Sequence, residues 1–324
     1  MSREGRYPKL GIRSKNEIAK RISSPRFPYR DALSLLKDVS MNFDKYWHDN
    51  KKESEPEKEK YVRSAAGTSL GLLLSLINEK ILAPSDELIP DFIYGGLEDR
   101  NHIQAAFKLL GKQKSRRLIS MDIVRFFEQI NEKRVFYFFY KKCHCSKDAA
   151  SLLARLCCVP KGPKGSRGSE KVLGRGFATS SRLSVWCNMD TFLRIKWKAA
   201  RLLERHDPEL VVFVDDIGVS ASNVTEERMD EVYKNLESIL EHSDSNQALP
   251  VNPKKKKNIT FAQGAEHLGL KLGRNKLTPG AKTSAKRDRV KNALQKNITT
   301  QERKKLLSKK KAYYLYKKQL QAPH

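Results

Sequence analysis

The stretch that decides the fold runs from residue 210 to residue 220 and reads Leu210-Val211-Val212-Phe213-Val214-Asp215-Asp216-Ile217-Gly218-Val219-Ser220. A run of apolar residues meets two adjacent acids and then resumes with alternating apolar and small residues, a pattern typical of strands. We therefore expect two strands joined at Asp215 and Asp216. Carboxylates at the tip of an apolar hairpin are costly to desolvate, so this pair needs a compensating cation.

A further acid lies inside a second apolar segment with strand character, Leu118-Ile119-Ser120-Met121-Asp122-Ile123-Val124. On a neighbouring strand, Asp122 and one acid of the pair would hold two cations ~4 Å apart, the arrangement that promotes phosphoryl transfer. Oxygen ligands favour Mg²⁺, with Mn²⁺ as an alternative. Adjacent strand residues point to opposite faces, so only one acid faces Asp122 unless the turn bends, and we assign that role to Asp215. Without the acid on the second strand, an Asp-Asp dipeptide is more often a structural element of a turn than a metal site.

The charge of the chain indicates a polyanionic partner. Its 324 residues include 64 Lys and Arg against 37 Asp and Glu, a formal net charge of +27 that suits nucleic acid. An anionic membrane surface would also attract this charge, but the longest apolar run, Leu70 to Ile77, is too short to cross a bilayer. The first residues lack an apolar stretch of signal-peptide length, which favours a cytoplasmic location and no membrane partner.

The cysteines argue against a disulfide framework, because five is an odd number in a chain of this length. Zinc binding is an alternative for the closely spaced cysteines and the histidine between two of them. Their spacing lacks two separated C-x-x-C knuckles, so we favour reduced thiols. The residues concerned are Cys143, His144, Cys145, Cys157, Cys158 and the more distant Cys187.

Apolar spacing predicts several helices along the chain and a basic tail. The expected helical segments are 12–40, 68–82, 102–110, 133–158, 183–205 and 226–241. Residues 49–60 read as an exposed charged loop and residues 160–176 as a loop dense in glycine and lysine. The tail from residue 281 to residue 324 holds 14 basic residues and 2 acidic ones.

The order of short motifs along the chain resembles that of reverse transcriptases over roughly residues 60 to 272. Five stations carry the resemblance: Asp122 with Phe126-Phe127, Gly176-Phe177-Ala178-Thr179-Ser180, Phe213-Val214-Asp215-Asp216, Asn252-Pro253-Lys254-Lys255 and Leu268-Gly269-Leu270. Within the family, the bacterial retron-type and defence-associated enzymes are most similar, since they share the D-x-x-x-F-F pattern. The segment from Tyr94 to His102 also resembles their signature before the palm.

This chain departs from the family pattern at several positions. Arg175 replaces the usual glutamine, Gly174 and Ser181 replace usual prolines, and Arg125 follows the catalytic aspartate where an acid is common. The retron Val-Thr-Gly signature is replaced by a segment beginning at His267.

The resemblance implies an α+β protein with the right-hand polymerase fold, in which an antiparallel palm sheet carries the aspartates between helical fingers and a short basic thumb. The division that follows is residues 1–59 as a helical extension and charged loop, 60–273 as interleaved fingers and palm, and 274–324 as the thumb. Basic residues of the thumb would track a duplex backbone, with affinity falling as salt rises.

The resemblance also implies a role for each residue at the catalytic stations. Asp122 and Asp215 would bind two Mg²⁺ ions, with Asp216 as an accessory carboxylate. Lys255 would protonate the leaving pyrophosphate, with Lys254 and Lys256 as alternatives and a solvated charge run as the plain alternative for all of them.

Further positions match residues that handle the incoming nucleotide. Phe127 would stack under the sugar and exclude a 2′-hydroxyl, although a core aromatic is the plain alternative. Gly176 would let the backbone approach the nascent base pair, and Arg175 would fork onto phosphate or alter substrate handling. Lys60 and Arg63 lie where the fingers contact the triphosphate.

The implied function is an RNA-directed DNA polymerase that adds deoxynucleoside triphosphates to a primer, in a retron-like or anti-phage defence setting. Its expected partners are an RNA template, a DNA or RNA primer, a dedicated noncoding RNA, and a protein partner or second copy of the chain. Two alternatives stay open: an RNA-synthesising polymerase of the same fold, and a catalytically silent protein that binds a structured RNA.

Overall fold

The computed structural model describes residues 7–166, 168, 170–243, 248–295 and 299–321. Helices and strands are mixed in it, so the α+β expectation is met at this level. The chain divides into two compact units. Unit 1 consists of residues 1–99, 123–192 and 241–249, and unit 2 of residues 100–122, 193–240 and 250–324. Among the described helices, none combines the length and apolarity needed to cross a membrane.

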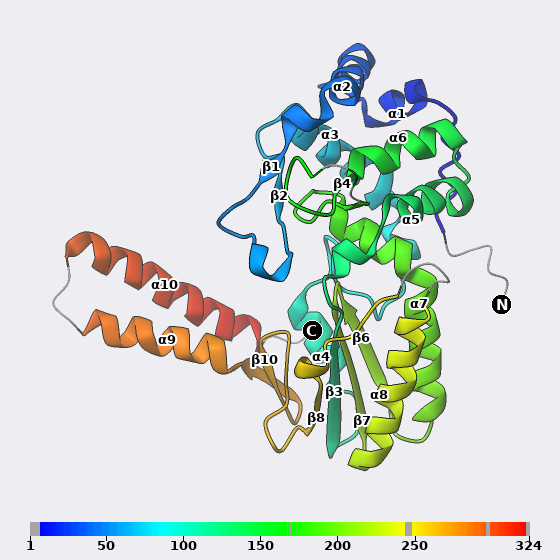
Figure 1. Cartoon of the computed structure of the whole chain (residues 1–324). Coiled ribbons are helices and arrows are strands. Elements are labelled where there is room, and N and C mark those ends of the chain that lie inside the picture. The colour runs from blue at the N-terminus through cyan, green and yellow to red at the C-terminus, as the bar shows by residue number, and fades with distance from the viewer. Residues whose placement is uncertain (1–6, 167, 169, 244–247, 296–298, 322–324) are drawn as a thin grey trace. The chain divides into compact units, whose positions relative to one another are not determined.

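Unit 1 is mostly helical (Figure 1). Its helices are α1 (Lys15–Ile22), α2 (Tyr29–Asn42), α3 (Ser69–Ile77), α5 (Glu132–Tyr137) and α6 (Lys147–Cys157). The expected helix over residues 12–40 is broken between α1 and α2, because Pro25 and Pro28 disfavour a continuous ladder of helical hydrogen bonds. Short π-helical turns, Asn78–Leu82 and Phe138–Lys142, extend α3 and α5.

Two small antiparallel sheets complete unit 1. Strand β1 (His48–Asp49) pairs with β2 (Arg63–Ser64), and the charged segment 50–62 connects them. Strand β4 (Cys158–Pro160) pairs with β5 (Lys171–Leu173). The strand β5 lies inside the segment 160–176 that we expected to be entirely loop, and its Val172 and Leu173 are buried. Long-range packing of two apolar residues therefore overrides the local glycine and lysine content.

Unit 2 is built on a four-stranded sheet with the order β6-β7-β3-β8. The strands are β3 (Arg116–Asp122), β6 (Glu209–Phe213), β7 (Asp216–Ser222) and β8 (Lys257–Thr260), and all neighbours are antiparallel. Apolar residues of β3, β6 and β7 are buried. As the sequence predicts, β6 and β7 form a hairpin that turns at the aspartates, and β3 lies next to β7.

Helices cover one face of this sheet (Figure 1). They are α8 (Glu226–Glu241) and the part of α7 (Ser180–Leu202) that belongs to unit 2. Five apolar or aromatic residues of α8 are buried at helical spacing, which explains why this otherwise charged segment forms a helix here. The shorter α4 (His102–Lys108) begins with a capping box in which Asn101 and Gln104 exchange hydrogen bonds with the backbone.

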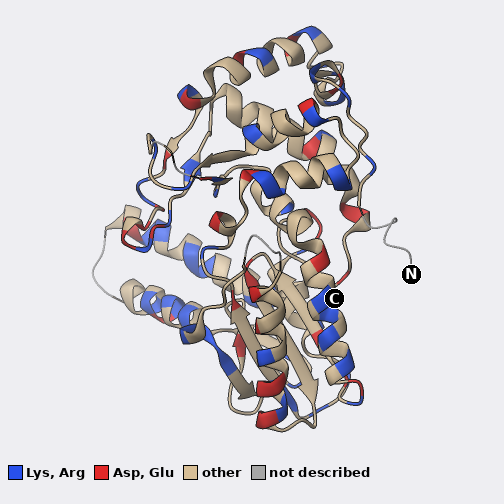
Figure 2. Ribbon diagram, turned by 45° about the vertical axis from the view of Figure 1, so that its right-hand side comes forward, with Lys and Arg blue, Asp and Glu red and all other residues tan. Residues whose placement is uncertain are grey.

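The remaining chain of unit 2 forms a three-stranded sheet and a helical hairpin. The sheet has the order β11-β10-β9, with β9 (Glu266–His267), β10 (Leu270–Gly273) and β11 (Lys276–Pro279). Helices α9 (Ala281–Leu294) and α10 (Thr300–Gln319) follow, and blue basic segments recur along both in Figure 2. Within α9 and α10, Val290 is the single buried residue, so the two helices have little apolar core of their own.

Candidate functional site

The end of β3 and the start of β7 bring two carboxylates together in unit 2. Asp122 lies opposite Asp216 in the strand register, and directly opposed residues of an antiparallel pair share one face. Asp215 lies outside the strand, in the turn that joins β6 to β7. The rule that adjacent strand residues point to opposite faces therefore does not apply to Asp215. The pairing of β3 with β7 places Asp216 opposite Asp122. The assignment of Asp215 as a metal ligand stays a prediction.

The turn itself is strained at Val214. Phe213 pairs with Asp216, which leaves Val214 and Asp215 as the two central residues of a tight hairpin turn. Val214 has φ +58°, in the left-handed region where β-branched residues are rare and glycine is preferred. Strained backbone of this kind tends to occur at functional sites.

Crowding and burial change the protonation of Asp216. Burial, followed by the nearby carboxylates of Asp215 and Asp122, raises the pKa of Asp216 to about 6. The charged form is thus disfavoured without a cation, which is the electrostatic condition that a metal ion relieves.

A lysine meets this cluster from the segment before β8. The Nζ atom of Lys255 lies 2.6 Å from the Oδ1 atom of Asp122. This hydrogen bond is the main cause that raises the pKa of Lys255, so its ammonium stays protonated. The backbone supports the contact, because the Asn252 N–H donates to the Asp122 carbonyl at 2.8 Å and the Asn252 side chain caps the turn Pro253–Lys255.

The neighbouring lysines have different environments. Lys256 forms an ion pair of 2.8 Å with Asp230 of α8, and its ammonium lies 4.5 Å from the centre of the Tyr233 ring. Lys257 donates to the Glu266 carbonyl at 3.3 Å. The geometry thus separates Lys255 from Lys256, two lysines that their spacing left as alternatives.

The oxygen atoms at Asp122 and Asp216 fit a hard divalent cation. Within the described ranges, no three His, Cys, Asp or Glu side chains form a ready-made metal group. Mg²⁺ commonly takes one or two carboxylates and completes its shell with water and substrate phosphates, so two facing carboxylates suit it. The cysteines suit metal less well, because burial raises the pKa of both Cys157 and Cys187 to about 12 and keeps them as thiols.

His267 fills the same face of the sheet farther from the aspartates. It is 4% exposed, and its Nδ1 atom lies 3.4 Å from the Ser120 hydroxyl. A Cβ atom on Gly218 would approach His267 Nε2 to 2.8 Å, so glycine is needed there for close packing. Burial lowers the pKa of His267 to about 4, and the ring is neutral at pH 7. The departure from the retron pattern at this position is therefore a packed core histidine.

Unit 1 holds Phe127 and Arg175 in one cluster with a buried acid. The guanidinium of Arg175 forks onto the carboxylate of Glu128, with Nε–Oε1 and Nη2–Oε2 distances of 3.0 and 2.9 Å. It also lies over the Phe127 ring, 4.9 Å from its centre. Sequence reasoning missed Glu128, whose only signal is an acid directly after two aromatic residues. Arg175 is thus engaged by Glu128 and Phe127 in this structure, and its contact with a phosphate stays a prediction.

Gly176 permits a close approach between protein segments. Its φ is +96°, and a Cβ atom there would lie 2.4 Å from the Arg63 carbonyl oxygen. The Arg63 N–H also donates to the Arg175 carbonyl at 2.6 Å. The loop Gly176–Ala178 borders an open cavity of about 650 Å³ together with residues 64–75 of the same unit.

The two basic residues expected at the triphosphate have contrasting surroundings. Arg63 is 3% exposed, pairs with Asp49, and donates to the carbonyls of Pro160 and Gly162. The rings of Trp47 and Tyr61 lie against its guanidinium. This geometry gives Arg63 a structural contact with the loop after β4. Lys60 is partly exposed and makes a long 3.4 Å contact with Glu55, which leaves it accessible to an anion.

No protein-family model matches the chain, and no curated protein matches its sequence.

Proposed function

We propose that this chain is an RNA-directed DNA polymerase that adds deoxynucleotides to a primer 3′-hydroxyl. The observation that carries the proposal is the pairing of Asp122 with Asp216 across β3 and β7, with Lys255 at 2.6 Å from Asp122. Two facing carboxylates on an antiparallel sheet, with a third on the strained turn before β7, form a site for cations that bind phosphate oxygens.

In the proposed reaction, the primer 3′-hydroxyl gives up its proton to solvent and its oxygen bonds to the α-phosphorus of the nucleotide, while the bond between that phosphorus and the oxygen bridging to the β-phosphate breaks. Magnesium, when bound, would polarise the phosphate and lower the pKa of the attacking hydroxyl. Asp122 and Asp216, with Asp215, would hold the ions. The protonated Lys255 would donate a proton to the leaving pyrophosphate. This transfer requires that the ion pair between Lys255 and Asp122 first opens.

The remaining assignments complete the proposal. Phe127 would discriminate against ribonucleotides, and the basic hairpin α9–α10 would contact the duplex backbone. The proposed setting is a bacterial retron-like or anti-phage defence system, with an RNA template, a dedicated noncoding RNA as a partner, and either a protein partner or a second copy of the chain.

Primer extension on RNA and DNA templates with Mg²⁺ tests the proposal. Wild-type protein should extend the primer, whereas Asp122→Asn and Asp215→Asn should reduce extension by at least 100-fold because each removes a ligand charge. Asp148→Asn, which changes an exposed acid at the start of α6, is the matched control and should retain activity. Extension that survives Asp122→Asn would refute the assignment of the site.

A second arm separates the two alternatives. Phe127→Ala should raise ribonucleotide incorporation if Phe127 contacts the sugar. Efficient ribonucleotide incorporation by the wild type would favour the RNA-synthesising alternative. RNA affinity that is insensitive to Mg²⁺, together with no incorporation on any template, would favour the silent RNA-binding protein.

A further inference from the structure

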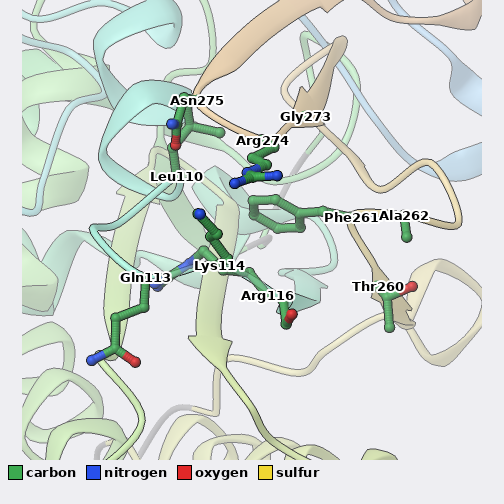
Figure 3. A pocket seen from close by; sticks show the side chains of 11 residues that line it. Leu110, Gln113, Lys114, Arg116, Thr260, Phe261, Ala262, Gly273, Arg274 and Asn275 are labelled. Atoms are coloured by element: carbon green, nitrogen blue, oxygen red, sulfur yellow. The ribbon is translucent and has the colours of Figure 1, made fainter.

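A cavity of about 450 Å³ lies in unit 2 at the opposite end of β3 from Asp122 (Figure 3). Arg116 borders the cavity and is the first residue of the strand, whereas Asp122 is the last. Six residue steps of strand span roughly 20 Å, so the cavity is separate from the carboxylate cluster. Its volume falls in the range of small-molecule and nucleotide sites.

Three segments of the chain form the walls of the cavity, and hydrogen bonds to other protein groups hold them in place. The N–H groups of Lys112 and Gln113 both donate to one carboxylate oxygen of Asp207, at 2.9 and 3.0 Å, and Arg116 binds the same oxygen at 2.5 Å. Although burial opposes it, these donors hold the pKa of Asp207 below its ordinary value, so the carboxylate stays charged. The segment from Lys112 to Arg116, which forms the first wall, is therefore held in place by the charged carboxylate of Asp207.

The other walls are turns of the two sheets. The Phe261 N–H donates to the Arg116 carbonyl at 3.0 Å, which ties the turn after β8 to the start of β3. Arg274 and Asn275 are the central residues of the β10–β11 hairpin, where Gly273 pairs with Lys276. The cavity is thus largely preorganised, which lowers the entropic cost of binding a ligand.

The lining groups combine an aromatic face with cations. Figure 3 shows the side chains of Lys114, Phe261 and Arg274 turned toward the same space. Lys114 and Arg274 are exposed, and no acid is among the lining residues, while Arg116 is already engaged by Asp207 and Ser220. Asn275 adds a side-chain amide at the rim, whereas the Gln113 side chain points away and accepts a hydrogen bond of 2.9 Å from the Ser222 hydroxyl.

This chemistry matches a nucleotide that is not base-paired. A base offers a flat π-face to an aromatic ring, and its phosphate offers oxygens to lysine and arginine on either side. We propose that the cavity binds one unpaired nucleotide of a single-stranded nucleic acid, with the base against Phe261 and the phosphate between Lys114 and Arg274. The proposal rests on the nucleic-acid-binding part of the proposed function but not on its chemistry.

The test is equilibrium binding of a fluorescent RNA hexanucleotide to the full chain, followed by anisotropy over a salt series. Phe261→Leu keeps an apolar side chain and the charge but removes the stacking face, so affinity should fall about tenfold. The double variant Lys114→Ala with Arg274→Ala should weaken binding and lower the salt slope by about 1 to 2. A DNA hexanucleotide of the same sequence shows whether the sugar matters, and an abasic hexanucleotide should not distinguish wild type from Phe261→Leu.

The matched control is Arg201→Ala with Lys234→Ala, which removes the same charge from exposed positions on α7 and α8. The proposal is overturned if this control weakens binding as much as the pocket double variant, or if Phe261→Leu binds with wild-type affinity. Asp122→Asn separates the two proposals, because it should lose synthesis and keep hexanucleotide binding. If the wild type synthesises DNA and the pocket variants bind like the wild type, the nucleotide-binding proposal alone is refuted. If binding depends on the pocket but no synthesis occurs, the polymerase proposal alone is refuted.

Discussion

The guanidinium of Arg175 forks onto the carboxylate of Glu128 and lies against the ring of Phe127. Glu128 is 5% exposed, so Arg175 neutralises a charge that could not otherwise be buried at low cost. Arg175 thus supports Phe127, the residue that we propose to contact the sugar.

Arg175→Gln should destabilise the protein by about 3 kcal/mol, since it leaves Glu128 buried without its partner. Chemical denaturation measures the loss. The double variant Arg175→Gln with Glu128→Gln should recover much of the stability, because no unpaired charge remains. In primer extension, the single variant should also change the ratio of deoxynucleotide to ribonucleotide kcat/KM. An unchanged ratio in a folded variant would show that Arg175 does not position Phe127.

Val214→Gly should stabilise the turn between β6 and β7. The φ of +58° costs a β-branched residue about 1 kcal/mol that glycine does not incur, and this outweighs the added freedom of the unfolded chain. Urea unfolding measures the change. The control is Val224→Gly, at a loop position whose own φ is not positive, which should destabilise the protein. If both variants destabilise equally, the turn is not strained.

Asp216→Asn should raise the stability of the protein in the absence of metal and weaken its response to magnesium. The neutral amide removes a buried charge and its repulsion with Asp215 and Asp122, a gain on the order of 1–2 kcal/mol at pH 8. Adding Mg²⁺ should raise the Tm of the wild type but have less effect on the variant. Equal Mg²⁺ responses of the two proteins would argue against Asp216 as a ligand.

His267 and Asp216 should oppose each other in the pH dependence of stability. The pKa of His267 is about 4 when folded and ordinarily 6.5, so its contribution of at most roughly 3 kcal/mol is present above pH 6.5 and is lost as pH falls toward 4. The raised pKa of Asp216, about 6, acts in the opposite direction, and stability increases as pH falls through that value.

Single variants separate these two contributions. Asp216→Asn should lose stability more steeply than wild type between pH 6 and pH 4, whereas His267→Gln should lose it less steeply. Denaturation midpoints at half-unit pH steps, all without metal, provide the measurement. Parallel curves for the three proteins would contradict the burial of both groups.

Local patterns determined much of the secondary structure. The alternation after residue 216, the apolar run before it and the strand around Asp122 predicted the hairpin and its neighbouring strand, because strand-length apolar runs next to acids are local features of the sequence. These local patterns did not predict β5, because its two buried residues form a strand only by pairing with β4. It also extended one helix through two prolines.

By itself, the sequence determined that strand-borne acids occur among basic segments, because residue type and spacing are local properties. Only the tertiary structure decided that Asp216 faces Asp122, that Lys255 rather than Lys256 reaches it, and that Arg63 and Arg175 are engaged by protein groups. Strand register and ion pairing both join residues that are distant in the chain. Which charged residues pair depends on the tertiary structure, because a charge that becomes buried requires a partner of opposite sign.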